Sequence, residues 1–380
     1  MRSLLLLIFS LLVGPPLSAQ ARPSDSQAFA ALSAKADGAR DANQLDEAAV
    51  LYTKALALRP GWVQGWWSLG TIQYDRNAYT EAARAFQEVI ALEPKTGTAR
   101  VMLGLCEFEL GQEDSALKHI EEGKKLGIDK DPQLRRVMFY HEGVLLQRKA
   151  KFETAQDALE ELCYEGDESR EAIRTLGMVQ LRIRARNSLV DTPPGADIVA
   201  RLGRAGCLAA QKKFDEARQD LGLLVSDYPD FPNIHYAYGR FLLEAHDTTH
   251  AVEEFEREIK NDPGHVFARL EIAAVKYRVD SPAGLPYAVE AVRLDPKLPF
   301  GHYLLGLLLL DSGNYQKAIP ELEIALKGFP EEAKVYFALG AAYARAGRKQ
   351  DAARARAAFV RLNNESSVPG GNQKYERNHR

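Results

Sequence analysis

The histidines are the side chains of this chain best suited to metal or acid–base chemistry, but their spacing supports neither. His141 and Glu142 begin the pattern of a zinc-binding helix, yet Leu145 stands where the second histidine would be needed. The eight histidines are otherwise dispersed, and His119 and His302 occupy ordinary positions of predicted helices. We therefore expect histidines that are hydrogen-bonded in the interior or exposed at the surface, and no metal site.

Nucleophiles and phosphate-binding loops are not indicated by the sequence either. It contains no Gly-x-Ser-x-Gly elbow, no P-loop and no dinucleotide fingerprint. Cys106, Cys163 and Cys207 are odd in number and widely spaced, without a Cys-x-x-Cys pair or the spacing of a disulfide framework. Each lies on an apolar helical face, which predicts small buried hydrophobic residues. We expect no catalytic residues, no cofactor and no enzymatic activity.

Clustered carboxylates could supply an acid–base pair, but here they alternate with basic residues on predicted helices. Such a mixture is typical of a solvated helix face whose charges pair along the helix. The carboxylates in question are Glu81, Glu121, Glu122, Glu253, Glu254 and Glu256. These residues are therefore predicted to be structural.

The elements that carry all these residues follow a repeat of about 34 residues, an interval that indicates stacked helical repeats. Prolines fall at this interval in two runs, Pro60 and Pro94, then Pro229, Pro263, Pro296 and Pro330. Alanines keep the same interval at Ala48, Ala82 and Ala116, and glycines keep it at Gly70 and Gly104. Three residue types thus share one period.

The clearest copy of the repeat carries Trp66, Leu69, Gly70, Ala82, Phe86 and Pro94. These residues resemble the tetratricopeptide repeat family, whose pattern is Trp-x2-Leu-Gly-x2-Tyr, then Ala-x3-Phe, then Pro; this copy departs from it at Gln73. The resemblance implies an all-α fold, a right-handed superhelical solenoid of stacked antiparallel helix pairs. Small residues let the two helices of a pair approach closely, and only stacking of neighbouring repeats buries the core.

The phasing predicts nine full repeats and one irregular repeat. Residues 28–186 are expected to hold four repeats and one extra helix, and residues 197–362 to hold five repeats. Asp191-Thr-Pro-Pro-Gly195 opposes a continuing helix, so residues 187–196 are predicted to be a loop and the hinge between two subarrays. The polar residues 363–380 are predicted to be a disordered tail.

The resemblance also implies a concave groove, lined by the first helix of each repeat, that accepts peptides or partner helices. Aromatic and arginine side chains at the groove-facing offset could grip an extended peptide, although aromatic residues there could equally pack between repeats. The candidate groove contacts are Trp67, Tyr74, Phe108, Tyr140, Arg148, Arg182, Tyr236, Arg240, Tyr303, Phe337 and Arg345.

The first 21 residues have the character of a targeting segment. Arg2 precedes an apolar run from Leu4 to Val13, and Pro15 and Pro16 are followed by small residues up to Ala21. This predicts a signal peptide and an exported chain, periplasmic or secreted, with an uncleaved membrane anchor as the alternative. No further segment is long and apolar enough to suggest an integral membrane span.

The balance of charged residues limits the classes of partner that we expect the chain to bind. The 49 basic and 52 acidic side chains give a net charge of −3, which provides no electrostatic reason to expect nucleic acid. The sequence thus predicts an exported scaffold or adaptor that binds protein or peptide partners in the concave groove, within an envelope assembly. A module that binds envelope polysaccharide through its aromatic side chains is the alternative, and the oligomeric state is left open.

Overall fold

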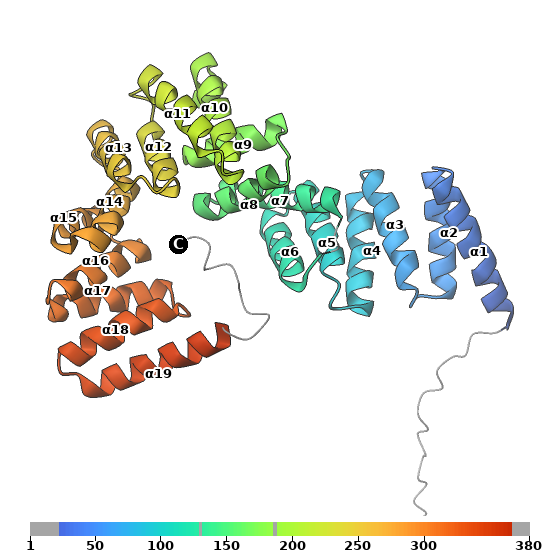
Figure 1. The fold of residues 1–380 in the computed structure, drawn as a ribbon. Coiled ribbons are helices and arrows are strands. Elements are labelled where there is room, and N and C mark those ends of the chain that lie inside the picture. The colour runs from blue at the N-terminus through green and yellow to red at the C-terminus, as the bar shows by residue number, and fades with distance from the viewer. Residues whose placement is uncertain (1–22, 129–130, 185–187, 367–380) are drawn as a thin grey trace, which may run out of the picture. The chain divides into compact units, whose positions relative to one another are not determined.

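The computed structural model describes residues 23–128, 131–184 and 188–366, and the regular structure of these residues is entirely helical (Figure 1). The predicted leader, residues 1–21, and most of the predicted tail lie outside the described residues. The chain divides into two compact units between Leu145 and Leu146. No helix in the described ranges is long and apolar enough to cross a membrane.

The first unit comprises six helices and most of a seventh. These are α1 (Pro23–Asp41), α2 (Leu45–Leu58), α3 (Val63–Asp75), α4 (Tyr79–Leu92), α5 (Gly97–Glu109), α6 (Glu113–Leu126) and α7 (Pro132–Arg148). The side chains that α2 to α4 bury include Tyr52, Ile72 and Phe86, so the core is built by the faces that the 3.6-residue spacing of apolar positions predicts.

The second unit begins at the end of α7 and holds the remaining helices. These are α8 (Phe152–Tyr164), α9 (Arg170–Gln180), the 3-10 turn η1 (Ser188–Asp191), α10 (Pro193–Ala210), α11 (Phe214–Asp227), α12 (Ile234–Glu244), α13 (Thr248–Asn261), α14 (Val266–Val279), α15 (Ser281–Leu294), α16 (Pro299–Asp311), α17 (Tyr315–Gly328), α18 (Ala333–Arg345) and α19 (Lys349–Ser366).

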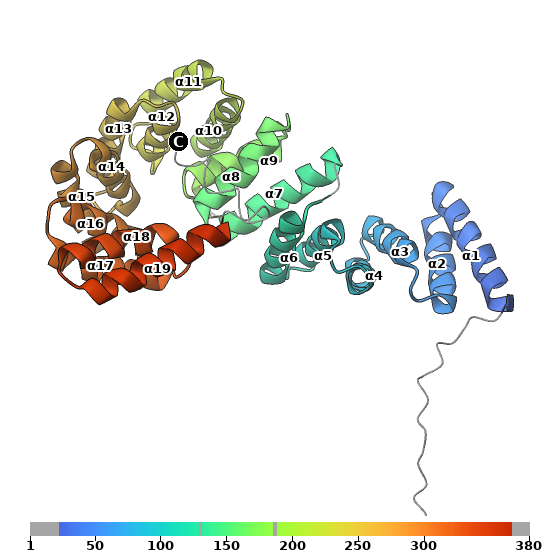
Figure 2. The same ribbon diagram turned by 60° about the horizontal axis from the view of Figure 1, so that its bottom comes forward.

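Among the described residues the α-helices can be grouped along the chain into nine consecutive pairs and one extra helix, α9. Small residues set the spacing within a pair. At Gly239 on α12 an added Cβ would lie 2.5 Å from the ring of Phe255 on α13, so only glycine lets that ring close the pair. Figures 1 and 2 show the helices of the second unit following an arc, with α12, α14 and α16 on its inner side.

Residues 187–196 were predicted to be a loop and hinge, but the described part of this segment, residues 188–196, is largely helical, which corrects that prediction. Thr192 caps α10 by accepting a hydrogen bond from the Gly195 backbone N at 3.2 Å, and the following prolines occupy the first turn of the helix. Proline is tolerated there because the first turn leaves its N–H groups without helical partners. The prolines that oppose the continuation of a preceding helix therefore form the first turn of α10.

Helix α9 has a tightly packed neighbour in α10, so it is not a helix whose partner is lost. An added Cβ at Gly177 of α9 would collide with the backbone carbonyl of Val199, and one at Gly203 of α10 would collide with that of Ile173. The two backbones are in direct contact, and the division between the compact units falls inside α7 rather than here. At the other end, α19 continues to Ser366, three residues beyond the predicted start of the tail.

All three cysteines are buried, as predicted, but two of them are bonded to each other, which the sequence did not predict. Cys163 of α8 and Cys207 of α10 form a disulfide bond, while Cys106 is a free, buried thiol. The two bonded residues are 44 positions apart, a spacing that gave no sign of pairing. The intervening α9 brings the two helices together, so only the fold reveals the bond.

Buried histidines bridge the helices of two pairs, as expected for hydrogen-bonded interior histidines. His235 Nδ1 of α12 lies 2.6 Å from Glu254 Oε2 of α13, and His302 Nδ1 of α16 lies 2.6 Å from Glu321 Oε2 of α17. Glu254 is only 5% exposed, which corrects its predicted place on the solvated face. A buried carboxylate is tolerated here because the histidine and Arg257 both contact it.

Candidate functional site

The predicted groove aromatics of the first unit are half-buried against neighbouring rings. Trp67 lies edge-on to Phe86 with ring centroids 5.5 Å apart, and Tyr74 packs in the same way on Tyr79 at 5.4 Å. Burial raises the pKa of Tyr74 to about 12. These two side chains therefore contribute area to the packing between helices.

Two further candidates, Phe108 and Tyr140, lie in the first unit, and a third, Arg148, belongs to the second. Phe108 and Tyr140 both pack edge-on against the ring of His141, with centroids 4.5 Å and 5.4 Å from it. Arg148, the last residue of α7, is exposed. Phe108 and Tyr140 therefore form a local aromatic group around His141.

The C-terminal candidates are dispersed over two helices. Tyr303 of α16 is half-buried, and burial raises the pKa of its hydroxyl to about 12. Phe337 of α18 is 63% exposed and lies against Phe359, with ring centroids 5.4 Å apart. Arg345, also on α18, stands over the ring of Tyr315 at 5.5 Å. Phe337 and Arg345 are exposed, whereas Tyr303 is half-buried.

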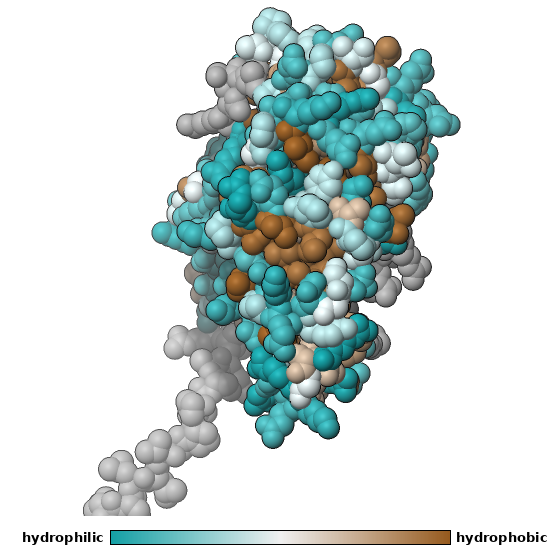
Figure 3. Space-filling model, turned by 90° about the vertical axis from the view of Figure 1, so that its left-hand side faces the viewer, coloured by the Kyte–Doolittle hydropathy of each residue, from teal (hydrophilic) through white to brown (hydrophobic). Residues whose placement is uncertain are grey.

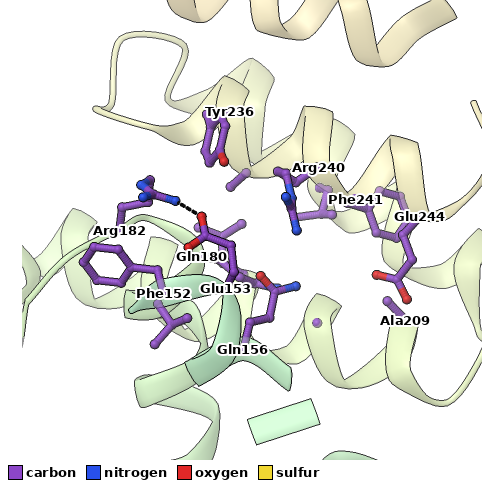
Figure 4. Close-up of a pocket in the computed structure, with 15 residues that line it drawn as sticks. Phe152, Glu153, Gln156, Gln180, Arg182, Ala209, Tyr236, Arg240, Phe241 and Glu244 are labelled. Atoms are coloured by element: carbon purple, nitrogen blue, oxygen red, sulfur yellow. Dashed lines mark hydrogen bonds and ion pairs between the residues drawn. The ribbon is translucent and has the colours of Figure 1, made fainter. Parts of the chain in front are cut away.

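Arg182, Tyr236 and Arg240 are the predicted residues that the structure brings together. They line one small cavity of about 30 Å³ in the second unit, enclosed by side chains from α8 to α12. Figure 4 shows Tyr236 and Arg240 of α12 facing Phe152 and Glu153 of α8 across it. Two arginines and an aromatic residue selected by their offset in different repeats thus converge on one site.

Arg182 holds the two sides of this cavity together. Its guanidinium forms an ion pair with Glu153 and lies 5.0 Å from the centroid of the Phe152 ring (Figure 4). The same guanidinium stands over the ring of Phe267, 3.6 Å from its centroid. Burial pushes the pKa of Glu153 up, but the charge and hydrogen bond of Arg182 outweigh it, so the pKa is lowered. Glu153 is therefore ionised at neutral pH.

Arg240 is neutralised by a carboxylate of another helix. It donates a hydrogen bond of 2.7 Å to Glu271 of α14, and the negative charge of Glu271 is the largest cause of the raised pKa of Arg240. Tyr236 is 3% exposed, and this burial raises the pKa of its hydroxyl. Both arginines of the site are thus paired within the protein.

Six polar or aromatic residues of the cavity are not among the candidates from the sequence: Phe152, Glu153, Gln156, Gln180, Phe241 and Glu244. The candidates follow the groove-facing offset on first helices, whereas α8 is a second helix and Gln180 and Glu244 lie at the C-terminal ends of α9 and α12. The irregular repeat is the sequence signal that indicates them, because α9 packs against both α8 and α10 and interrupts the regular alternation of first and second helices.

A wider cleft of about 410 Å³ adjoins the cavity and shares Phe152 and Arg182 with it. Phe267, His265 and Asp262 complete its wall, together with neighbouring backbone. His265 Nδ1 accepts a hydrogen bond from the Ala268 backbone N, so its Nε2 donates to Asn233 Oδ1 at 2.8 Å. Burial lowers the pKa of His265 to about 4, and the ring is neutral at pH 7.

A separate hydrophobic patch lies on the face shown in Figure 3, the left-hand side of Figure 1, where α15 and α17 lie. Exposed apolar side chains on these helices include Val289 and Ile324, which are 49% and 40% exposed. The patch offers area without polar groups that would orient a ligand. The cavity and cleft in the second unit are therefore the better candidate site.

The arrangement is suited to holding a ligand. In the described part of the chain, no group of three or more histidine, cysteine or carboxylate side chains is placed to hold a metal ion. The cavity instead offers aromatic faces, amide groups and ionised side chains, which fix the orientation of a bound segment.

The repeat model of the tetratricopeptide family matches residues 33–91, 69–131, 208–266 and 303–365, together more than half of the chain. The chain belongs to the tetratricopeptide repeat family. Tetratricopeptide repeat proteins generally mediate protein–protein interactions and scaffolding. The unmatched stretch between 131 and 208 contains α7, α8, α9, η1 and most of α10. The candidate site of this tetratricopeptide repeat protein therefore joins an unmatched side, which includes α8 and Arg182, to α12, which lies in a matched segment.

The individual proteins that resemble this chain do so at low sequence identity. Superkiller protein 3 of Schizosaccharomyces pombe is 24% identical over 307 residues, which are 76% of this chain but only 20% of that protein. A structure titled MamA 41-end from Desulfovibrio magneticus RS-1 is 24% identical with a TM-score of 0.39, covering 44% of this chain and 96% of its own. The Cut9-Hcn1 hetero-tetramer structure is 13% identical with a TM-score of 0.37, covering 88% and 87%. The family assignment depends on the four matched segments alone.

Proposed function

We propose that this protein is an exported, non-enzymatic scaffold that binds an extended segment of a protein partner in the cleft beside Arg182. The observation that carries the proposal is the convergence of Arg182, Tyr236 and Arg240 on a cavity that adjoins a 410 Å³ cleft. An extended peptide offers backbone hydrogen-bonding groups along its length and side chains for the cavity.

The half-buried aromatics elsewhere favour this function over the polysaccharide alternative. Sugar rings stack on exposed aromatic faces, whereas Trp67 and Tyr74 pack against the rings of Phe86 and Tyr79. The polar groups that could orient a ligand are concentrated instead at the cleft in the second unit. A role within an envelope assembly is part of the proposal.

The disulfide bond supports export independently of the leader-like residues at the N-terminus. Cys163 and Cys207 are buried, 1% and 2% exposed, and they join α8 to α10. Disulfides persist in the periplasm and in secreted proteins and are rare in reducing compartments.

Intact-mass analysis of the protein from fractionated native cells tests whether the chain is exported. A start near Gln20 or Arg22 with one disulfide supports export, and an intact Met1 with three thiols in the cytosol opposes it.

Site-specific photocrosslinking in native cells tests the binding site. A benzophenone amino acid replaces Asp262, which is exposed at the rim of the cleft, and in a matched variant it replaces Glu253, which is exposed on α13 away from the cleft. We expect a defined protein adduct with the probe at 262 and none with the probe at 253, identified by mass spectrometry.

The identity of the crosslinked peptide decides between outcomes. Adducts that map to one short segment of one partner support groove binding, because a scaffold that grips a peptide presents it in a single register. Equal adducts from both positions, or none from 262, would show that the cleft is not the binding surface.

A further inference from the structure

The charged residues that line the cavity beside Arg182 and Arg240 are two arginines and two glutamates, Glu153 and Glu244. The arginines form ion pairs with Glu153 and with Glu271, which lies outside the cavity lining. Lys212 and Arg240 act on Glu244 through their charges. Glu244 is therefore the lining carboxylate that an entering cation could pair with directly.

A second carboxylate stands close by on α8. Glu160 lies one helical turn beyond Gln156, whose side-chain amide donates to Glu160 Oε1 at 2.6 Å. Burial, followed by the nearby charge of Glu244, raises the pKa of Glu160 to about 8. Burial also raises the pKa of Glu244, against the opposing effects of Lys212 and Arg240. Desolvation is the largest cause of both shifts, and it outweighs the charges of the nearby cations.

The cavity also holds a hydrogen-bond acceptor that no donor of the lining reaches. The side-chain Oε1 of Gln180 is buried and has no hydrogen-bond partner among the described residues. Gln180 lines the cavity together with Glu244. Leaving a buried acceptor unpaired is costly, so a donor that enters the cavity is favoured.

The remaining walls suit the stem of a long side chain. Phe241, Leu202 and Ala209 line the cavity between the polar groups. A volume of about 30 Å³ has room for a head group near the size of a water molecule, such as an ammonium. Ammonium has three donors and no acceptor, and it is carried on a flexible four-carbon stem in lysine.

We propose that this cavity receives the lysine side chain of a peptide segment that lies in the adjoining cleft, with Glu244 as its counter-charge and Gln180 as a further acceptor. The inference rests on the proposed function, because a peptide must occupy the cleft for its side chain to reach past Arg182. It assigns a chemical preference to the partner, namely a basic residue at one position.

Binding to a positional-scanning library of short synthetic peptides tests the preference. One position at a time is fixed and the others are mixtures, and the full chain is compared with its Glu244→Gln and Gln180→Leu variants. We expect lysine to be preferred over glutamine at one position by about tenfold, the scale of a hydrogen bond to a charged group. Both variants should lose this preference.

Glu253→Gln is the matched control, because Glu253 is an exposed glutamate on α13 that does not line the cavity. It should keep the wild-type preference, and circular dichroism should show that every variant is folded. Peptide binding without a preference for lysine, or with one that persists in Glu244→Gln, would overturn the inference and leave the proposed function standing. If the wild-type chain bound no peptide of the library, the proposed function would fall, and this inference with it.

Discussion

The guanidinium carbon of Arg182 lies 3.6 Å from the centroid of the Phe267 ring, and the same guanidinium pairs with Glu153. This contact joins α8, the end of α9 and the start of α14. Arg182 holds its position with a φ of 56°, a left-handed conformation that is unfavourable for a residue with a Cβ. The side-chain contacts therefore maintain a strained backbone at the edge of the cleft.

Two substitutions of Arg182 separate the loss of its side-chain contacts from the relief of its backbone strain. Arg182→Ala removes the ion pair and the cation–π contacts and keeps the backbone strain, so we expect a loss of about 2 kcal/mol of stability. Arg182→Gly removes the same contacts but relieves the strain, and it should be more stable than Arg182→Ala by about 1 kcal/mol. Thermal unfolding followed by circular dichroism measures both. Equal melting temperatures for the two variants would show that the backbone is not strained.

The raised pKa of Glu160 predicts a pH-dependent stability. Its folded-state pKa of about 8 lies above the ordinary carboxyl value of 4.5, so the folded chain binds the proton more tightly. Stability from this group therefore falls as the pH rises from 4.5 to about 8. Glu160→Gln removes the dependence, and it should melt above wild type at about pH 9 and close to it at about pH 5. A constant difference across that range would contradict the shift.

Two glycines in helices of the second unit should respond to alanine with opposite signs. At Gly177 an added Cβ would collide with the Val199 carbonyl, so Gly177→Ala should force α9 and α10 apart and cost more than about 2 kcal/mol. At Gly222 of α11 the nearest atom is the Tyr238 hydroxyl at 3.7 Å, so alanine should stabilise by up to about 1 kcal/mol. Differential scanning calorimetry of both variants checks the signs. A neutral Gly177→Ala would mean that the two helices are not in backbone contact.

The three cysteines predict a fixed pattern of alkylation. Cys163 and Cys207 are bonded, and burial raises the pKa of the Cys106 thiol to about 12, so the folded chain should not react with iodoacetamide. Denaturation without reductant should expose the one thiol of Cys106, and reduction should expose all three. Mass spectrometry counts the labels. Two or three labels before reduction would exclude the disulfide.

The same bond predicts an effect on stability. Reduction opens a loop of 44 residues between α8 and α10, and the chain-entropy model assigns such a cross-link about 4 kcal/mol. We expect the Cys163→Ala, Cys207→Ala double variant to melt well below wild type. Cys106→Ala, which leaves the bond intact, is the control, and it should lose only the packing of one buried side chain. A double variant no less stable than this control would contradict the prediction.

The sequence by itself determined the fold class and the helix phasing. Periodic prolines, alanines and glycines specify where helices end and where two backbones approach, and these are local properties that each repeat restates. The sequence also identified Arg182, Tyr236 and Arg240 as groove candidates, because the position of a residue within its own repeat can be read without knowing the tertiary structure.

Only the tertiary structure decided which of these candidates meet. The extra helix α9 packs on α10 through Gly177 and Gly203, and this contact brings Cys163 to Cys207 and the carboxylates of α8 to α12. Neither the disulfide nor the cavity is encoded in a spacing, because both join residues of different repeats across an irregular one. Thr192-Pro-Pro is an example, because this sequence is compatible both with the end of one helix and with the start of the next. Packing determines which of the two occurs.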